Sequence, residues 1–175
     1  MTGARRAKVL AVDDRPENLV ALQAILEGLA VEVVAVGGGE DALKQLLVDD
    51  FAVILLDAHM PGMDGFETAA HIKRRERTRH VPILFLTAVD YDPHLAFRGY
   101  QAGAVDYITK PFDPWVLRSK VAVFVDLWTM HRQVLDQAEE CARLRAGVEE
   151  AVQLLAADPP AVRRARERLT QLRDH

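Results

Sequence analysis

The segments VLAVDD at residues 9–14 and VILLD at residues 53–57 decide the fold of this chain. Each is a short apolar run that ends in aspartate, without the apolar-polar alternation of a strand that has one face in water. A β-branched run at residues 31–36 and an apolar run at residues 83–86 predict further strands, and a fifth strand is predicted at residues 106–109. Amphipathic stretches with helical spacing separate the runs, at residues 16–30, 40–49, 66–76 and 94–102. This order predicts a doubly wound α/β fold, with right-handed connections around a parallel sheet that is buried on both faces.

The composition is that of an ordinary globular protein. The chain has 175 residues, of which 50% are hydrophobic and 27% are charged, and its formal net charge is -4. These values predict one domain with an appendage and give no sign of nucleic acid as the main partner. The single cysteine, Cys141, excludes an internal disulfide bond. No apolar run is as long as a signal-peptide core or a membrane span, so we expect a cytoplasmic protein without a membrane partner.

Polar side chains stand at the carboxyl ends of four predicted strands. The first strand ends in Asp13 and Asp14, the third in Asp57, the fourth in Thr87 and the fifth in Lys110. Because the carboxyl ends of parallel strands meet at one edge of a sheet, where such folds bind ligands, we expect these side chains to lie together. Any one of them alone is best read as a polar residue that ends a strand. All five at one edge indicate a site.

The chemistry of these side chains favours a magnesium ion and a phosphoryl group. Clustered carboxylates repel one another unless a cation joins them. Oxygen ligands without nearby His or Cys favour Mg²⁺ over zinc. An aspartate carboxylate is also a competent nucleophile for phosphoryl transfer, while Thr87 can hydrogen-bond a phosphate oxygen and Lys110 supplies a mobile positive charge.

Four motifs carry a family resemblance, namely VLAVDD (9–14), LLDAHMPGMDG (55–65), LTA (86–88) and YITKPF (107–112). Together they resemble the receiver domains of two-component response regulators, over about residues 7–125. The resemblance implies the fold of the chemotaxis receiver, a flavodoxin-like, five-stranded parallel sheet of order 2-1-3-4-5. It implies that a sensor histidine kinase or a phosphotransfer protein donates the phosphoryl group. It also implies a signalling module that catalyses only its own phosphorylation and dephosphorylation.

The resemblance assigns the acceptor and the metal ligands. Asp57 is expected to be the phosphoacceptor. Mg²⁺ is expected to bind directly to Asp14, Asp57 and the backbone carbonyl of His59, and Asp13 is expected to act on the metal largely through water.

The same resemblance implies how the phosphate is held and sensed. Thr87 and the backbone of Ala88 are expected to hold it, and Lys110 to pair with it. Thr87 and Tyr107 match the family's switch pair, in which the hydroxyl moves to the phosphate and the aromatic ring turns inward. The peptide bond between Lys110 and Pro111 is expected to be cis, a bond type that is rare except before proline.

Two other functions use similar residues. A Mg²⁺-dependent phosphohydrolase of the haloacid dehalogenase type also carries a reactive aspartate on an α/β sheet. That class has Asp-x-Asp after its first strand, whereas Arg15 stands at the second position after Asp13 here. The other alternative is a scaffold with a decayed receiver, and the complete set of acidic, hydroxyl and lysine residues argues against it.

Residues 126–175 predict a helical arm. Asp113-Pro114 is typical of a helix start, and no Gly or Pro follows until Gly147. From Leu127 onward, a heptad pattern runs along this helix. The pattern predicts a parallel coiled coil between two copies of the chain. The predicted dimer seam consists of Leu127, Met130, Val134, Cys141, Leu144, Val148 and Leu155.

The arm has a second reading, a helical hairpin in which residues 162–172 fold back on the long helix. The hairpin is an alternative to dimerisation, and both readings hold together only if the arm forms a four-helix bundle. We expect residues 126–175 to be a coiled-coil dimerisation arm or a linker to an output. The chain is then a stand-alone regulator or the amino-terminal piece of a longer kinase or phosphatase.

Overall fold

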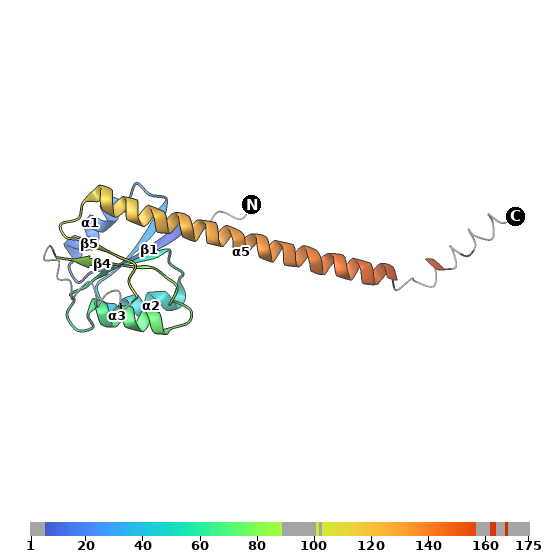
Figure 1. Cartoon of the computed structure of the whole chain (residues 1–175), viewed down its shortest axis with the longest axis horizontal. Helices are drawn as coiled ribbons and strands as arrows, with labels where there is room; N and C mark the ends of the chain where they lie inside the picture. Colours follow the sequence, from blue (N-terminus) through green and yellow to red (C-terminus); the bar gives the residue numbers. More distant parts are fainter. Residues whose placement is uncertain (1–5, 89–100, 102, 157–161, 164–166, 168–175) are drawn as a thin grey trace. The chain divides into compact units, whose positions relative to one another are not determined.

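The computed structural model describes residues 6–88, 101, 103–156, 162–163 and 167 (Figure 1). The chain divides into two compact units, Met1–Met130 and His131–His175. The helix predicted at residues 94–102 lies largely outside the described residues.

The first unit is built on a five-stranded parallel sheet in the order β2-β1-β3-β4-β5. The strands are β1 (Ala7–Val12), β2 (Val31–Val36), β3 (Val53–Asp57), β4 (Ile83–Thr87) and β5 (Asp106–Thr109). Every neighbouring pair of strands is parallel. The predicted α/β class and strand order are therefore confirmed.

The described helices are α1 (Pro16–Leu26), α2 (Gly39–Val48), α3 (Gly65–Arg74) and α5 (Pro114–Ala156). α1 ends earlier than the predicted residue 30. The amide of Leu29 turns back to the Leu26 carbonyl at 2.9 Å. In addition, the guanidinium of Arg118 donates to the Ile25 carbonyl at 2.8 and 3.1 Å. These contacts satisfy carbonyls at the helix end and fix the first part of α5 against α1.

The core of the first unit lies on both faces of the sheet. Successive residues of β1 point to opposite faces, so Leu10 and Val12 belong to the buried cluster beneath α2 and α3. Val9 and Ala11 belong to a second cluster, beneath α1 and the start of α5. Figure 1 shows these two pairs of helices on opposite sides of the sheet. Burial on both faces explains why the strands read as apolar runs without alternation.

The start of α3 packs directly against the end of β3. Asp64 caps the helix, because its carboxylate accepts the Glu67 amide at 2.8 Å while the Glu67 carboxylate accepts the Asp64 amide at 3.4 Å. The next residue, Gly65, touches the strand: a Cβ atom there would lie 2.1 Å from the carbonyl oxygen of Asp57. A side chain at this position would therefore displace either α3 or the end of β3.

The second unit contains, among its described residues, the end of α5. Several apolar side chains of the predicted seam are exposed there: Val134 is 62% exposed, and Leu144 and Val148 are each 63% exposed. Cys141 is also exposed, and the side chain of Leu155 lies outside the described residues. The hairpin alternative depends on residues 162–172, most of which are likewise not described. Within the described residues, no helix has the length and apolar character needed to cross a bilayer.

We expect Gly65→Ala to destabilise the first unit by about 3 kcal/mol, because the added methyl group meets backbone rather than a movable side chain. Urea unfolding measures the change. Gly37→Ala is the matched control, since a Cβ atom at that position has nothing within 4 Å. Equal unfolding free energies for the two variants would contradict the close approach of α3 to β3.

Candidate functional site

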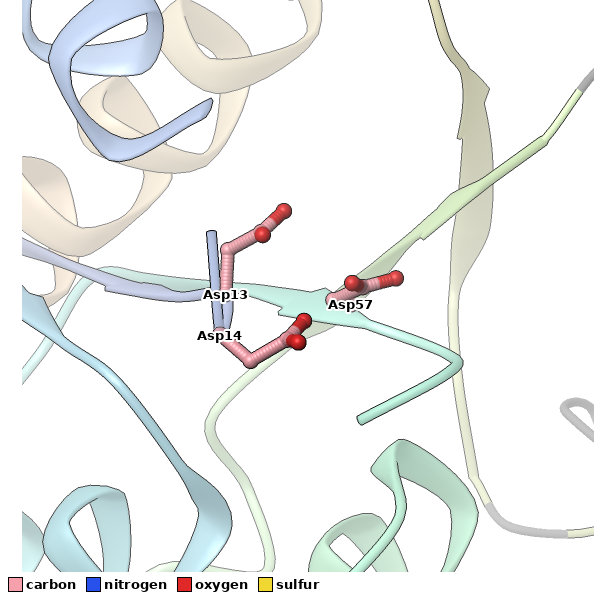
Figure 2. Close-up of side chains that lie close together, drawn as sticks. All are labelled: Asp13, Asp14 and Asp57. Carbon is pink, nitrogen blue, oxygen red and sulfur yellow. The ribbon is translucent and has the colours of Figure 1, made fainter. Parts of the chain in front are cut away.

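Three aspartates meet at the carboxyl edge of the sheet. β1 and β3 are neighbours, with Val12 paired to Leu56, so Asp13 and Asp57 come next to each other. Asp14 joins them, and each side chain offers an oxygen that lies within 4.8 Å of the others (Figure 2). Asp13 has no exposed surface (0%), Asp57 is 5% exposed and Asp14 is exposed. The sheet thus places two buried carboxylates and one accessible carboxylate in a single cluster.

Lys110 reaches this cluster from the residue that follows β5. Its ammonium nitrogen lies 2.7 Å from Asp13 Oδ2 and 3.0 Å from Asp57 Oδ2. Its backbone amide donates to the Thr87 carbonyl at 2.7 Å, and its peptide bond to Pro111 is cis. One cation therefore offsets the repulsion between two buried carboxylates.

Asp13 has more donors than Lys110 alone. Its Oδ1 accepts the Arg15 amide and the Asn18 side-chain amide, each at 2.9 Å. Its Oδ2 accepts Asn18 at 3.0 Å as well as Lys110 at 2.7 Å. Asn18 is a residue that sequence reasoning missed. The available signal was its place in the first turn of the helix after β1, close in sequence to the strand end.

The environment of Asp57 disfavours its charge. Burial is the largest influence and raises the pKa of this carboxyl above its ordinary value. Hydrogen bonds from Lys110 and from the His59 amide, which lies 3.2 Å from Asp57 Oδ1, act in the opposite direction. The negative charge of Asp13 raises the pKa further. An additional cation at this edge would therefore favour the ionised form of Asp57.

The remaining predicted residues lie on the two strands beyond β3. Thr87 ends β4, one residue past the partner of Asp57 in the sheet register, and is half-buried. Ala88 follows it and is exposed. Tyr107, on β5, stacks its ring on Phe85 with the centroids 5.9 Å apart. The structure thus puts Lys110 in contact with the carboxylates, Thr87 and Ala88 at the adjacent strand end, and Tyr107 against the core.

The donor set suits a hard divalent cation. The clustered ligand groups are all carboxylates, and within the described residues no histidine or cysteine joins them. Oxygen ligands of this kind are those that Mg²⁺ uses in proteins, commonly together with phosphate oxygens. The accessible carboxylate of Asp14 leaves the cluster open on one side, whereas Asp13 and Asp57 are enclosed.

A parallel α/β sheet with an acidic edge and a lysine beside the central aspartate defines a phosphoacceptor module. The chain matches the model of the response regulator receiver domain over residues 9–122. The chain therefore belongs to the response regulator receiver family of two-component systems, as the motifs predict, and its receiver domain is a phosphoacceptor signalling module.

Solved receivers share this fold. Chemotaxis protein CheY4 of Vibrio cholerae is 32% identical, with a TM-score of 0.65, covering 69% of this chain and 99% of that chain. The receiver domain of sensor histidine kinase PA1611 from Pseudomonas aeruginosa is 30% identical, with a TM-score of 0.63, and covers 70% of this chain and 99% of that chain. The PA1611 receiver has a magnesium ion coordinated in its active-site cleft. The predicted likeness to the chemotaxis receiver is confirmed.

Longer proteins are also similar to this chain. Response regulator PleD of Caulobacter vibrioides is 35% identical over 144 residues, which are 81% of this chain and 31% of PleD. Sensor histidine kinase GacS of Pseudomonas protegens is 34% identical over 166 residues, which are 82% of this chain and 17% of GacS. The chain thus spans less than a third of either relative, and the match concerns a part of each.

We expect Asp57→Asn to raise the melting temperature of the metal-free chain at neutral pH by about 2–4 °C, the shift that ~1 kcal/mol produces in a chain of this size. The pKa of Asp57 is higher in the folded state than in the unfolded state, where it is near 3.8. The contribution of Asp57 to folding stability is therefore fully present below pH 3.8 and is lost as the pH rises through the folded-state pKa. Asparagine removes that loss at neutral pH.

Thermal melts in EDTA at several pH values measure this effect. The gain from Asp57→Asn should shrink as the pH falls through the raised folded-state pKa and vanish well below 3.8, where the wild-type carboxyl is protonated in both the folded and the unfolded state. Asp14→Asn serves as the control, because that side chain is exposed. A gain that grows in acid, or a variant that is less stable at neutral pH, contradicts the prediction.

Proposed function

We propose that Asp57 accepts a phosphoryl group from a sensor histidine kinase or a phosphotransfer protein, and that the aspartyl phosphate regulates an output. The position of Asp57 carries this proposal. It ends the central strand of the sheet, with the Lys110 ammonium 3.0 Å away and two further carboxylates beside it. In the reaction a carboxylate oxygen attacks phosphorus, the bond from phosphorus to the donor breaks, and an acyl phosphate forms. Donor and acceptor must share a compartment, which we propose is the cytoplasm.

The carboxylate cluster is the proposed Mg²⁺ site. Bound there, the ion would neutralise charge on the phosphoryl oxygens as they approach Asp57. We propose Asp14, Asp57 and the backbone carbonyl of His59 as direct ligands, with Asp13 acting largely through water. Accessibility supports this division, because Asp14 is exposed whereas each oxygen of Asp13 already accepts from two donors. The magnesium ion coordinated in the active-site cleft of the PA1611 receiver supports a metal at this edge.

We propose that Lys110, Thr87 and Ala88 hold the transferred group. The Lys110 ammonium leaves the carboxylates for a phosphoryl oxygen, a short movement because it already lies 3.0 Å from Asp57 Oδ2. The Thr87 hydroxyl and the Ala88 amide approach from the neighbouring strand end and donate to the other oxygens. Positioning and charge neutralisation of this kind account for most of the catalysis in phosphoryl transfer.

β5 and the start of α5 offer a route from the site to the arm. We propose Thr87 and Tyr107 as the switch pair, in which the hydroxyl moves to the phosphate and the ring turns inward. Lys120 of α5 pairs with the Asp106 carboxylate and donates to the Tyr107 carbonyl at 3.0 Å. Movement of β5 would therefore act directly on α5. The two states need differ by only a few kcal/mol for the phosphoryl group to bias them.

We propose that residues 7–125 form the receiver and that residues 126–175 form an arm that joins two copies in a parallel homodimer. Apolar side chains along α5 support this, including Leu127, 55% exposed, and Met130, 59% exposed. A second helix in register would cover them, as in a coiled coil. The length of PleD, of which this chain spans 31%, favours a second role for the arm as a linker to an output.

We expect one phosphoryl group on the wild type after incubation with acetyl phosphate and Mg²⁺, and none on Asp57→Asn, because the amide is not a nucleophile for phosphorus. EDTA should abolish labelling of the wild type. Intact-mass spectrometry measures uptake directly. Labelling of Asp57→Asn at the wild-type rate would sink the assignment of the acceptor.

We expect the double variant Leu144→Glu/Val148→Glu to be monomeric at micromolar concentration, since it puts charges in the apolar seam of a dimer. Light scattering measures the mass in solution. Arg143→Glu gives the control, because this exposed residue lies outside the predicted seam, and the variant should leave the dimer intact. In the wild type, mild oxidation should cross-link the two copies of Cys141. A monomeric wild type without this cross-link contradicts the dimer and leaves the hairpin as the better reading.

A further inference from the structure

Asn18 contacts the acidic cluster through its side chain, and the proposed phosphoryl transfer assigns no role to this contact. Its amide nitrogen donates to both oxygens of Asp13, at 2.9 and 3.0 Å. Asn18 is half-buried and lies in the first turn of α1, and its own backbone amide donates to the Arg15 carbonyl at 3.0 Å. The backbone of Asn18 thus takes part in the first turn of α1, while its side chain reaches Asp13 at the end of β1.

The contacts of Asp13 show what Asn18 supplies. An ionised carboxylate can accept about four hydrogen bonds, and Asp13 receives four contacts, from Arg15, Lys110 and twice from Asn18. Lys110 is the donor that carries a charge and the one that also contacts Asp57. If Lys110 turns to a phosphoryl oxygen, Asp13 remains a fully buried carboxylate, at 0% exposure.

A buried carboxylate that loses a donor pays a large desolvation penalty unless other donors remain. With Asn18 in place, Asp13 keeps the Asn18 contacts and the Arg15 amide at 2.9 Å after Lys110 departs. Without Asn18, only the Arg15 amide remains. The hydrogen bonds from Asn18 would therefore lower the free-energy cost of moving Lys110 away from Asp13.

We propose that Asn18 is a positioning residue that stabilises the Asp13 carboxylate and so allows Lys110 to move from Asp13 to the phosphoryl group on Asp57. The inference rests on the proposed function, because it assumes that Asp57 is the acceptor. Asn18 acts through Asp13 and Lys110 and touches no reacting atom. Because it contacts neither Asp14 nor Asp57, its loss should affect the phosphoryl-bound state more than the binding of Mg²⁺.

The test compares Asn18→Leu with Gln23→Leu, which also replaces a side-chain amide with leucine but at an exposed position of the same helix. Calorimetry first gives the affinity for Mg²⁺ alone. It then gives the affinity for beryllium fluoride, a non-covalent phosphoryl mimic, at saturating Mg²⁺. We expect Asn18→Leu to bind the mimic about tenfold or more weakly, the effect of losing hydrogen bonds to a charged group, and to bind Mg²⁺ as the wild type does. Gln23→Leu should leave both affinities unchanged.

Asn18→Asp provides a second variant of the same size, in case Asn18→Leu does not fold. It replaces the donor with a carboxylate that faces Asp13, so Lys110 is held more tightly and the mimic should again bind more weakly at saturating Mg²⁺. Wild-type affinity for the mimic in either folded variant overturns the inference. A parallel loss of Mg²⁺ affinity in Asn18→Leu also overturns it, since that result indicates a general disturbance of the site.

The wild type separates this inference from the proposed function. A wild type that binds the mimic and is labelled by acetyl phosphate, beside an Asn18→Leu variant that behaves identically, refutes the role of Asn18 alone. A wild type that neither binds the mimic nor takes up phosphoryl from acetyl phosphate refutes the proposed function, and the inference falls with it.

Discussion

The ammonium of Lys110 lies between Asp13 and Asp57, 2.7 Å from one and 3.0 Å from the other, and the acidic edge depends on this pair of contacts. The sheet forces the two aspartates together because β1 and β3 are paired in register through Val12 and Leu56, the residues that directly precede them. Neither carboxylate can turn to solvent, since they are 0% and 5% exposed. Breaking such a pair leaves an uncompensated buried charge, which is far costlier than the pair itself is stabilising. A phosphoryl group on Asp57 would attract the same Lys110 ammonium. The contacts that stabilise the unphosphorylated site would therefore compete with the contact between Lys110 and the phosphoryl group.

The rest of the first unit keeps this edge rigid. Two apolar clusters bury the strands from both faces, so the strand ends cannot shift without disturbing the core. Gly65 allows α3 to pack against the Asp57 carbonyl, and the capping box at Asp64 holds the helix start in place. Asp13 accepts the Arg15 amide at the start of α1, where the partial positive charge of the helix also favours an anion. The positions of the carboxylates are therefore determined mainly by the backbone of the strands and helices around them.

Two cations on α5 tie that helix to the receiver at different places. Arg118 donates to the Ile25 carbonyl at the end of α1, and Lys120 contacts Asp106 and the Tyr107 carbonyl on β5. β5 is also the strand that Lys110 follows. A change in the contacts of Lys110 therefore acts on a strand that already touches α5, without a separate relay through the core.

The sequence by itself determined the five apolar strands, the start of α5 at Asp113-Pro114 and the presence of Asp13, Asp14 and Asp57 at strand ends, because burial and strand ends leave local patterns in residue type. The motif resemblance added the strand order. Helix ends were harder to predict from the sequence. α1 ends at Leu26, where the Ile25 carbonyl accepts from Arg118, a residue far along the chain. Only the tertiary structure decided that Lys110 contacts Asp13, 97 residues away, that Asn18 donates to both oxygens of Asp13, and that Gly65 meets the Asp57 carbonyl. Periodicity shows which face of an element is buried, whereas a contact between two particular atoms depends on how the elements pack.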